Sequence, residues 1–156
     1  SAASDVYKRQ NKMNKNYKIH PAWLSGFIDG EGTFSVDILK NSTIALGYQV
    51  QLRFVLTQHI QDKELMYAIK DFLSCGTIVK DTDTKLQLRI RAIKDLEDKL
   101  FPILDKYPLQ TKKHLDEMIF RQVFIMIKNK EHLTEDGLNK VRYLKSKINR
   151  RTNSYL

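Results

Sequence analysis

The chain has 156 residues, 42% of them hydrophobic, which is enough for one domain with a core of its own. Its formal net charge of +9 favours a polyanionic partner, although charge alone leaves a nucleic acid and a merely basic surface equally open. No apolar run approaches the roughly 20 residues of a membrane span, so we expect no membrane partner. The one cysteine, Cys75, excludes an internal disulfide and has no histidine near it at zinc-ligand spacing, so we expect a buried, inert thiol.

The first residues of the chain show no hydrophobic periodicity, and no apolar segment follows their positive charges as it would in a signal peptide. We expect residues 1–16 to be a disordered leader or a cloning or sequencing artefact, and residues 17–156 to form a single domain. There is no internal repeat, because nothing later in the chain copies the segment LSGFIDGEG at residues 24–32.

The first predicted elements are a helix and a hairpin. Pro21 suits a first helical turn, and the apolar residues after it predict a helix that ends near Gly30. Residues 33–39 then alternate between polar and apolar, and residues 48–58 do so more regularly. This alternation predicts two strands, which the polar loop 40–47 joins into a hairpin.

A second helix and a second hairpin follow. Residues 61–74 have apolar residues at helical spacing, and this helix is expected to end at Gly76. Residues 76–80 and 85–93 read as strands around the turn 81–84.

The remainder of the chain is predicted to be helical. Residues 94–104 have a helical pattern up to Pro102, where we expect the helix to stop. A long helix over 111–130 and a basic helix over 138–151 come next. The buried stripe of the long helix is predicted at Phe120, Val123, Phe124 and Ile127. The element order predicts an α+β domain, in which helices cover one face of an antiparallel sheet.

The other face of the predicted sheet is polar. Its expected members are Ser35, Asp37, Gln49, Gln51, Arg53, Lys85, Gln87, Arg89 and Arg91. A half-buried sheet normally shows water a polar face. Here, however, acidic residues are almost absent apart from Asp37 and Asp81, whereas glutamine and arginine pair with the edges of adenine and guanine. We therefore favour base reading in DNA over a merely solvated face.

Acids and glycines alternate where the first helix meets the first strand, at Asp29, Gly30, Glu31 and Gly32. A helix C-terminus carries a negative partial charge, so each carboxylate there is unfavourable by roughly 0.3–1 kcal/mol unless it is neutralised. Mg²⁺ prefers a few carboxylate or carbonyl oxygens, which the side chain of Glu31 and the carbonyl of Gly30 would supply. The alternative is that both acids are ordinary turn residues before a strand.

Small residues on the first helix predict a second molecule. Gly26 and Gly30 lie four residues apart on one helix face, so another helix could approach to near backbone contact. Because the segment occurs once in the chain, we expect a two-fold homodimer whose interface includes Ser25, Gly26, Asp29 and Gly30. Such symmetry would bring two copies of Glu31 together.

The segment LSGFIDGEG at residues 24–32 resembles the signature motif of the LAGLIDADG homing endonucleases, and the order of elements over about residues 17–150 is similar to theirs. The resemblance implies their αββαββα fold with a saddle-shaped sheet, and the single motif implies a homodimer. It also implies an intron-encoded enzyme that makes a staggered double-strand break in a long, nearly palindromic DNA target. The cofactor would be Mg²⁺, with Mn²⁺ as a substitute. Asp29, the first acid of the motif, is expected to be structural.

The resemblance also assigns catalytic roles. Glu31 corresponds to the family's metal ligand, with the carbonyl of Gly30 contributing, and Gln58 to a residue near the active-site water. Lys112 is the candidate basic residue beside the scissile phosphate, with Lys113 as the alternate. Family members often carry a basic residue just after the glutamine, where this chain has His59, Asp62 and Lys63.

Two rival functions remain open from the sequence. One is an intron maturase, which binds its own intron RNA and assists splicing with weak or no DNA cleavage. The other, a transcriptional regulator with a borrowed fold, is disfavoured, because it should have lost the metal ligand and gained a DNA-binding domain, whereas Glu31 is present. The abundance of lysine, asparagine and isoleucine, whose codons are AT-rich, favours an organellar origin in a mitochondrion or chloroplast.

Overall fold

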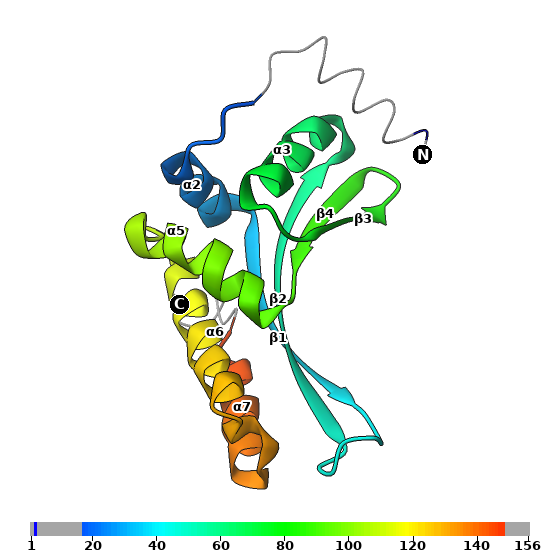
Figure 1. Ribbon diagram of the computed structural model, residues 1–156, viewed down its shortest axis with the longest axis vertical. Coiled ribbons are helices and arrows are strands. Elements are labelled where there is room, and N and C mark those ends of the chain that lie inside the picture. Colours follow the sequence, from blue (N-terminus) through cyan, green and yellow to red (C-terminus); the bar gives the residue numbers. More distant parts are fainter. Residues whose placement is uncertain (1, 3–16, 149–156) are drawn as a thin grey trace, which may run out of the picture.

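The computed structural model of the protein describes residue 2 and residues 17–148. The leader expected at residues 1–16 therefore lies outside the described part except for one residue, as does the predicted helical stretch after residue 148. Four antiparallel strands form one open sheet in the order β1-β2-β4-β3. Figure 1 shows the helices gathered on one side of this sheet, with α6 and α7 side by side along the long β1–β2 hairpin. The predicted α+β class is confirmed.

Both predicted hairpins are present. The strands are β1 (Gly32–Lys40), β2 (Tyr48–His59), β3 (Thr77–Thr82) and β4 (Lys85–Ile90). The prediction that the last strand continues to residue 93 is wrong. It stops at Ile90 because Ala92, in extended conformation, already caps the helix that begins at Ile93. Arg91 therefore follows the strand instead of belonging to it.

Helices occupy most of the remaining described chain. The α-helices are α2 (Pro21–Glu31), α3 (Lys63–Leu73), α4 (Ile93–Asp95), α5 (Phe101–Lys106), α6 (Lys113–Lys128) and α7 (Glu135–Lys147). Shorter helical turns are η1 (Ile60–Asp62), η2 (Leu96–Leu100) and η3 (Glu131–Leu133). Helix α7 begins three residues before its predicted start, because the Oγ1 of Thr134 accepts from the N–H of Gly137 and caps it.

Pro102 does not end its helix, contrary to the sequence prediction. A proline inside an α-helix clashes with the carbonyl four residues earlier. Here the preceding turn, η2, is a π-helix, in which the N–H of Phe101 reaches back to the carbonyl of Leu96. The wider turn accommodates Pro102 within the first turn of α5, so the helical path continues to Lys106.

The core lies between the apolar sheet face and the helices. The rings of Phe34, Phe54 and Phe120 are 0–1% exposed, and each neighbouring pair has its centroids 5.2 Å apart. The stripe predicted on α6 is buried at Phe120, Val123 and Phe124 and partly buried at Ile127. One residue of the polar sheet face, Val55, is also buried.

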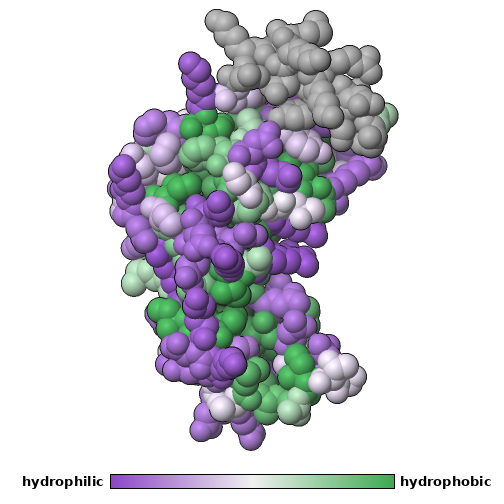
Figure 2. All heavy atoms as spheres, in the orientation of Figure 1, coloured by the Kyte–Doolittle hydropathy of each residue, from purple (hydrophilic) through white to green (hydrophobic). Residues whose placement is uncertain are grey.

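Cys75 is only partly buried, in contrast to the prediction, and burial raises the pKa of its thiol. In the orientation of Figure 2, hydrophilic side chains cover much of the surface and hydrophobic ones reach it in smaller patches. None of the helices in residues 17–148 is both long enough and apolar enough to cross a bilayer.

Candidate functional site

Helix α2 passes directly into strand β1 without a loop. The N–H of Gly32, the first strand residue, donates to the carbonyl of Ile28 and ends the helix. A Cβ added at Gly32 would lie 2.8 Å from that carbonyl oxygen and 3.2 Å from the ring of Phe54. Only glycine fits here, because the helix end packs closely on the sheet. The carboxylates of Asp29 and Glu31 are consequently carried by a backbone that cannot shift freely.

Asp29 holds the turn that precedes α6. Its Oδ2 accepts from the N–H of Gln110 at 2.7 Å, and its Oδ1 accepts from the N–H and the Oγ1 of Thr111 at 3.0 and 2.6 Å. Burial alone would raise the pKa of Asp29, but these hydrogen bonds and the nearby Lys113 together lower it. Asp29 is thus ionised and hydrogen-bonded within the chain, which is consistent with the structural role that the family resemblance implies for it.

The two lysines after this turn differ in environment. Lys113 is 7% exposed, and its Nζ donates to the carbonyl of Ile28 at 3.3 Å, at the C-terminal end of α2. A cation is favourable at that end of a helix, so Lys113 offsets the charge that Asp29 brings there. Lys112 is exposed at the N-terminal boundary of α6. Of the two candidates, Lys112 is the one at the surface.

Glu31 and Gly30 are exposed beside this contact. In the described part of the chain, the carboxylate of Glu31 forms no hydrogen bond or ion pair, and no group of three or more His, Cys, Asp or Glu side chains could hold a metal ion. An unengaged carboxylate close to the carbonyl groups of a helix end suits a hard cation such as Mg²⁺. One chain, however, supplies only part of the coordination sphere.

Gln58 lies at the same end of the sheet. Gly32 pairs with Leu56, so the last residues of β2 run beside the end of α2. The side chain of Gln58 is half-buried, and its Oε1 accepts from the N–H of His59 at 3.3 Å. The Asp29 contact therefore joins the two segments that carry Glu31 and Lys112, and Gln58 lies two residues beyond the pairing of Leu56 with Gly32.

The exposed face of α2 differs from residue to residue. A Cβ added at Gly26 or at Gly30 would meet nothing within 4 Å among the described residues, so neither position is covered by them. Ser25, in contrast, is 4% exposed and donates to the carbonyl of Tyr107. The side chains of Ser25 and Asp29 are engaged within the chain, so of the four residues predicted at the dimer interface, Gly26 and Gly30 are the two that remain open to a second helix. The interface itself stays a prediction.

The polar sheet face has an internal order that the sequence did not reveal. Arg53 pairs with Asp37 across β1 and β2 at 3.0 Å, and the Nε of Arg89 donates to the Oε1 of Gln87 at 2.8 Å. The pairing follows from the strand register, in which Ser35 lies opposite Arg53 and Asp37 opposite Gln51, so that Asp37 is diagonally opposite Arg53. A correct prediction of this register from the hairpin would have indicated the ion pair. The other members are exposed or half-buried, namely Ser35, Gln49, Gln51, Lys85 and Arg91.

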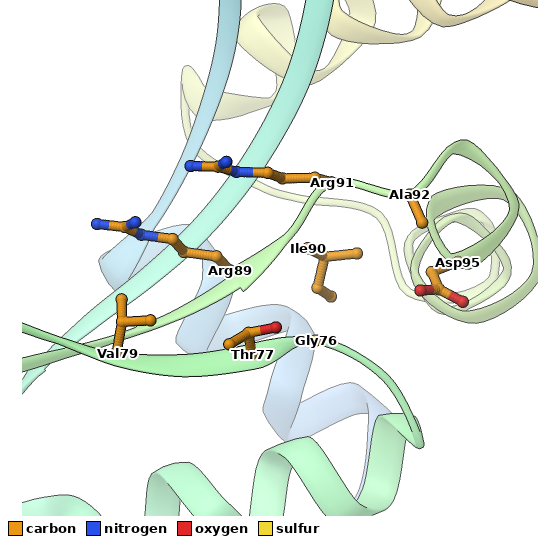
Figure 3. A pocket seen from close by; sticks show the side chains of 8 residues that line it. All are labelled: Gly76, Thr77, Val79, Arg89, Ile90, Arg91, Ala92 and Asp95. Carbon is orange, nitrogen blue, oxygen red and sulfur yellow. The ribbon is translucent and has the colours of Figure 1, made fainter.

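Hollows lie beside this face. One of about 400 Å³ contains Thr77, Arg89, Arg91 and Asp95 in its lining. Figure 3 shows the side chains of Arg89, in β4, and of Arg91, just after it, extending in the same direction. At the opposite sheet edge, Lys145 of α7 donates to the carbonyl of Val36 and helps to line a second hollow. Nothing in the basic pattern of α7 distinguishes Lys145 from its neighbours, so sequence reasoning missed it.

The model of the family described as LAGLIDADG endonuclease matches residues 24–124, from α2 to α6. The chain belongs to the LAGLIDADG endonuclease family. Among the solved structures of this family, the homing endonuclease I-TnaI is 37% identical, with a TM-score of 0.82 over 89% of this chain and 94% of that one. The I-SmaMI LAGLIDADG homing endonuclease bound to cleaved DNA is 36% identical, with a TM-score of 0.82 over 88% of this chain and 46% of that one.

The curated LAGLIDADG relatives are longer proteins. A probable intron-encoded endonuclease of Neurospora crassa is 35% identical over 93% of this chain and 27% of its own length. Two others are named for introns of ND4 and cox1, which are mitochondrial genes. The chain spans between a quarter and a third of the length of the first relatives it matches. Family members depend on divalent cations in general.

Proposed function

We propose that the protein is a site-specific homing endonuclease that hydrolyses both strands of a long, nearly palindromic DNA target with a staggered break. The observation that carries the proposal is the Asp29 contact. It ties the exposed carboxylate of Glu31, two residues away, to the turn that carries Lys112, one residue away. The contact thereby links the segment that carries the candidate metal ligand, Glu31, to the segment that carries the candidate phosphate-binding cation, Lys112. The basic polar face on the same sheet supports DNA as the substrate.

Each residue of the site has a role in this proposal. The carboxylate of Glu31 and the carbonyl of Gly30 would hold a divalent cation, Mg²⁺ or Mn²⁺. When bound, such an ion lowers the pKa of water and stabilises charge on a phosphate. The ammonium of Lys112 would stabilise the developing charge on the scissile phosphate, and the amide of Gln58 would orient the attacking water.

The polar sheet face would lie in the major groove. Antiparallel strands fit that groove, and the residues proposed to form the DNA-binding face are Ser35, Asp37, Gln49, Gln51, Arg53, Lys85, Gln87, Arg89 and Arg91. Contacts of lysine and arginine with phosphates would make the affinity fall steeply with salt, with a slope of roughly −0.9 per neutralised phosphate.

We propose that a second copy of the chain completes the active site. One chain supplies a single exposed carboxylate at the junction, and I-SmaMI, a chain about twice as long, has room for two such units. Gly26→Leu tests this, because a Cβ at this position meets no described atom within 4 Å, whereas a leucine side chain would block close approach of a second α2. We expect a folded monomer that does not cleave, whereas Asn139→Leu, at an exposed site on α7, should leave both properties unchanged. A Gly26→Leu variant that cleaves normally would exclude this interface.

Cleavage of a randomised duplex library tests the function itself. Purified protein is incubated with the library and Mg²⁺, or with EDTA as the control, and the cut ends are sequenced. We expect cuts within one symmetric motif, only with the metal. No cutting, together with selective binding of structured intron RNA, would instead favour the maturase function.

The cellular location is proposed from the relatives. Two of them are named for introns of mitochondrial genes, and the abundance of lysine, asparagine and isoleucine, whose codons are AT-rich, agrees with an organellar genome. Sequencing the DNA that flanks the gene tests this. A nuclear location outside any intron would contradict it.

A further inference from the structure

Three arginines on or beside the polar sheet face differ in what holds their guanidinium groups. Arg53 is bound by Asp37 through two contacts: Nε lies 3.0 Å from Oδ2, and Nη2 lies 3.4 Å from Oδ1. Arg89 donates from Nε to the Oε1 of Gln87 at 2.8 Å. Arg91, just beyond the end of β4, has no comparable partner among residues 17–148. Two of the three guanidinium groups are therefore oriented before any ligand binds.

The orienting contacts leave a defined edge of each guanidinium available. Arginine presents five N–H groups in a planar fork. Because the Nε side of Arg53 and of Arg89 is occupied, the edge formed by Nη1 and Nη2 remains for a ligand. Fixing a long side chain in advance also reduces the entropy lost on binding. A planar ligand edge with two adjacent acceptors fits this arrangement best.

We propose that Arg53 and Arg89 each read a guanine, with Asp37 and Gln87 as the residues that orient them, and that Arg91 binds a phosphate. This inference rests on the proposed function as a DNA endonuclease. In the major groove, guanine offers the two acceptors O6 and N7 side by side, whereas adenine offers one acceptor beside a donor. A phosphate accepts hydrogen bonds from many directions, so Arg91 needs no orienting partner.

The register of the sheet predicts the spacing of the two guanines. Arg53 pairs with Ser35 and Arg89 with Val55, so the arginines stand on adjacent strands, two residues apart along them. At about 3.4 Å per residue and about 4.8 Å between strands, their Cα atoms are roughly 8 Å apart. That distance corresponds to about two base steps of roughly 3.4 Å. We expect the guanines within about one to three base pairs of each other in each half-site.

The test is selection of bound sequences from a randomised duplex library in EDTA, with the wild type and three single variants. Arg53→Ala and Arg89→Ala should each lose the guanine preference at one position, by about 5- to 150-fold. Arg91→Ala should lower the affinity for all sequences alike and reduce the magnitude of the salt slope by about one.

A matched pair of variants tests the orienting role of Asp37. Asp37→Asn and Asp83→Asn both remove one negative charge, but Asp83 pairs with Lys80 and contacts neither arginine. Both should therefore strengthen binding to all sequences to a similar small extent. Only Asp37→Asn should weaken the preference for guanine at the position that Arg53→Ala identifies. Gln87→Ala should do the same at the position of Arg89.

The outcomes separate the inference from the proposed function. The inference fails if the wild type enriches a defined motif but the Arg53→Ala and Arg89→Ala variants lose affinity for all sequences alike. It also fails if the positions that these variants affect are not guanines, or if Asp37→Asn behaves like Asp83→Asn. If the wild type enriches no motif at all, the proposed function itself is wrong.

Discussion

The junction at the end of α2 and the polar face of the sheet bind their charged groups in different ways. At the junction, Asp29 and Lys113 are held mainly by backbone groups of Gln110, Thr111 and Ile28. On the sheet face, by contrast, charged and polar side chains are held by other side chains, such as Asp37 by Arg53. Backbone partners stay in place when side chains are substituted, whereas side-chain partners do not.

This difference has a consequence for evolution of the site. At the junction only the Asp29 side of each hydrogen bond to the N–H groups of Gln110 and Thr111 is a side chain, so most neighbouring substitutions should leave Glu31 and Lys112 in place. On the sheet face, one or two substitutions change which side-chain groups face the DNA. Such a face can adapt to a DNA target whose sequence changes. Substitutions at the junction should therefore affect the rate of cleavage, and substitutions on the face should affect which DNA is cut.

The largest expected effect is at Glu31. Glu31→Gln removes the charge that would hold the cation, so cleavage should fall by more than the roughly 10–100-fold that loss of an outer-shell residue costs. Target affinity should change little. Single-turnover cleavage and a binding titration measure the two quantities, with Glu135→Gln, an exposed glutamate on α7, as the control. A Glu31→Gln variant that cuts at the normal rate would refute the metal role.

The adjacent lysines should give opposite results. Lys112→Met should slow cleavage by roughly 10²–10³-fold, the usual effect of losing one group that stabilises transition-state charge. It should lower the free energy of unfolding by no more than about 1 kcal/mol, because the side chain is exposed. Lys113→Met should instead lower the free energy of unfolding by about 1.5–3 kcal/mol, because it removes a charged hydrogen bond to the carbonyl of Ile28. Urea denaturation and single-turnover kinetics of both variants are needed. If the effects are exchanged, the assignment of Lys112 is wrong.

A smaller effect is expected when the contact between the two halves of the site is weakened. In Asp29→Asn, an NH₂ group faces one of the N–H donors of Gln110 and Thr111, so the free energy of unfolding should fall by about 1–2 kcal/mol. Cleavage should slow by about 10-fold through looser placement of Lys112. Thr111→Val removes one of the three hydrogen bonds to Asp29 and also the Oγ1 that accepts from the N–H of Lys113, but it keeps the carboxylate of Asp29. Its effect on cleavage should therefore lie between those of wild type and Asp29→Asn. Normal kinetics in a destabilised Asp29→Asn would show that the contact is purely structural.

The local parts of this molecule could be predicted from the sequence. The alternation of residues 48–58 reflects the pleat of β2, and glycine at Gly32 reflects the close packing of α2 on the sheet. The error at Pro102 has a physical origin, because a shift from α to π hydrogen bonding leaves no trace in hydrophobic spacing. The early start of α7 follows from the single cap at Thr134, which the apolar pattern does not include.

The site was harder to predict, since it depends on contacts between distant segments. No pattern links Asp29 to Thr111, 82 residues later, so its carboxylate could not be assigned to that turn. The sequence could, however, have shown which of Lys112 and Lys113 is exposed. Lys113 precedes the buried Phe120 by seven residues, or two helical turns, and therefore lies on the buried face of α6, whereas Lys112 does not.

The smallest expected effect concerns acid. The pKa of Asp29 is lower in the folded than in the unfolded protein, so its contribution to stability is complete above the unfolded value of about 4 and is lost as the pH falls through the folded value. Burial raises the pKa of Glu117, although Arg121 and His114 act against it, so ionisation of Glu117 costs stability as the pH rises. Glu117 is present in both wild type and Asp29→Asn, so its contribution cancels in the difference between their free energies of unfolding. That difference in unfolding free energy should stay constant from about pH 7 to about pH 5 and shrink below about pH 4. Urea denaturation of both proteins at each pH measures it, and a difference that persists undiminished at about pH 2 would show that the contact does not depend on an ionised Asp29.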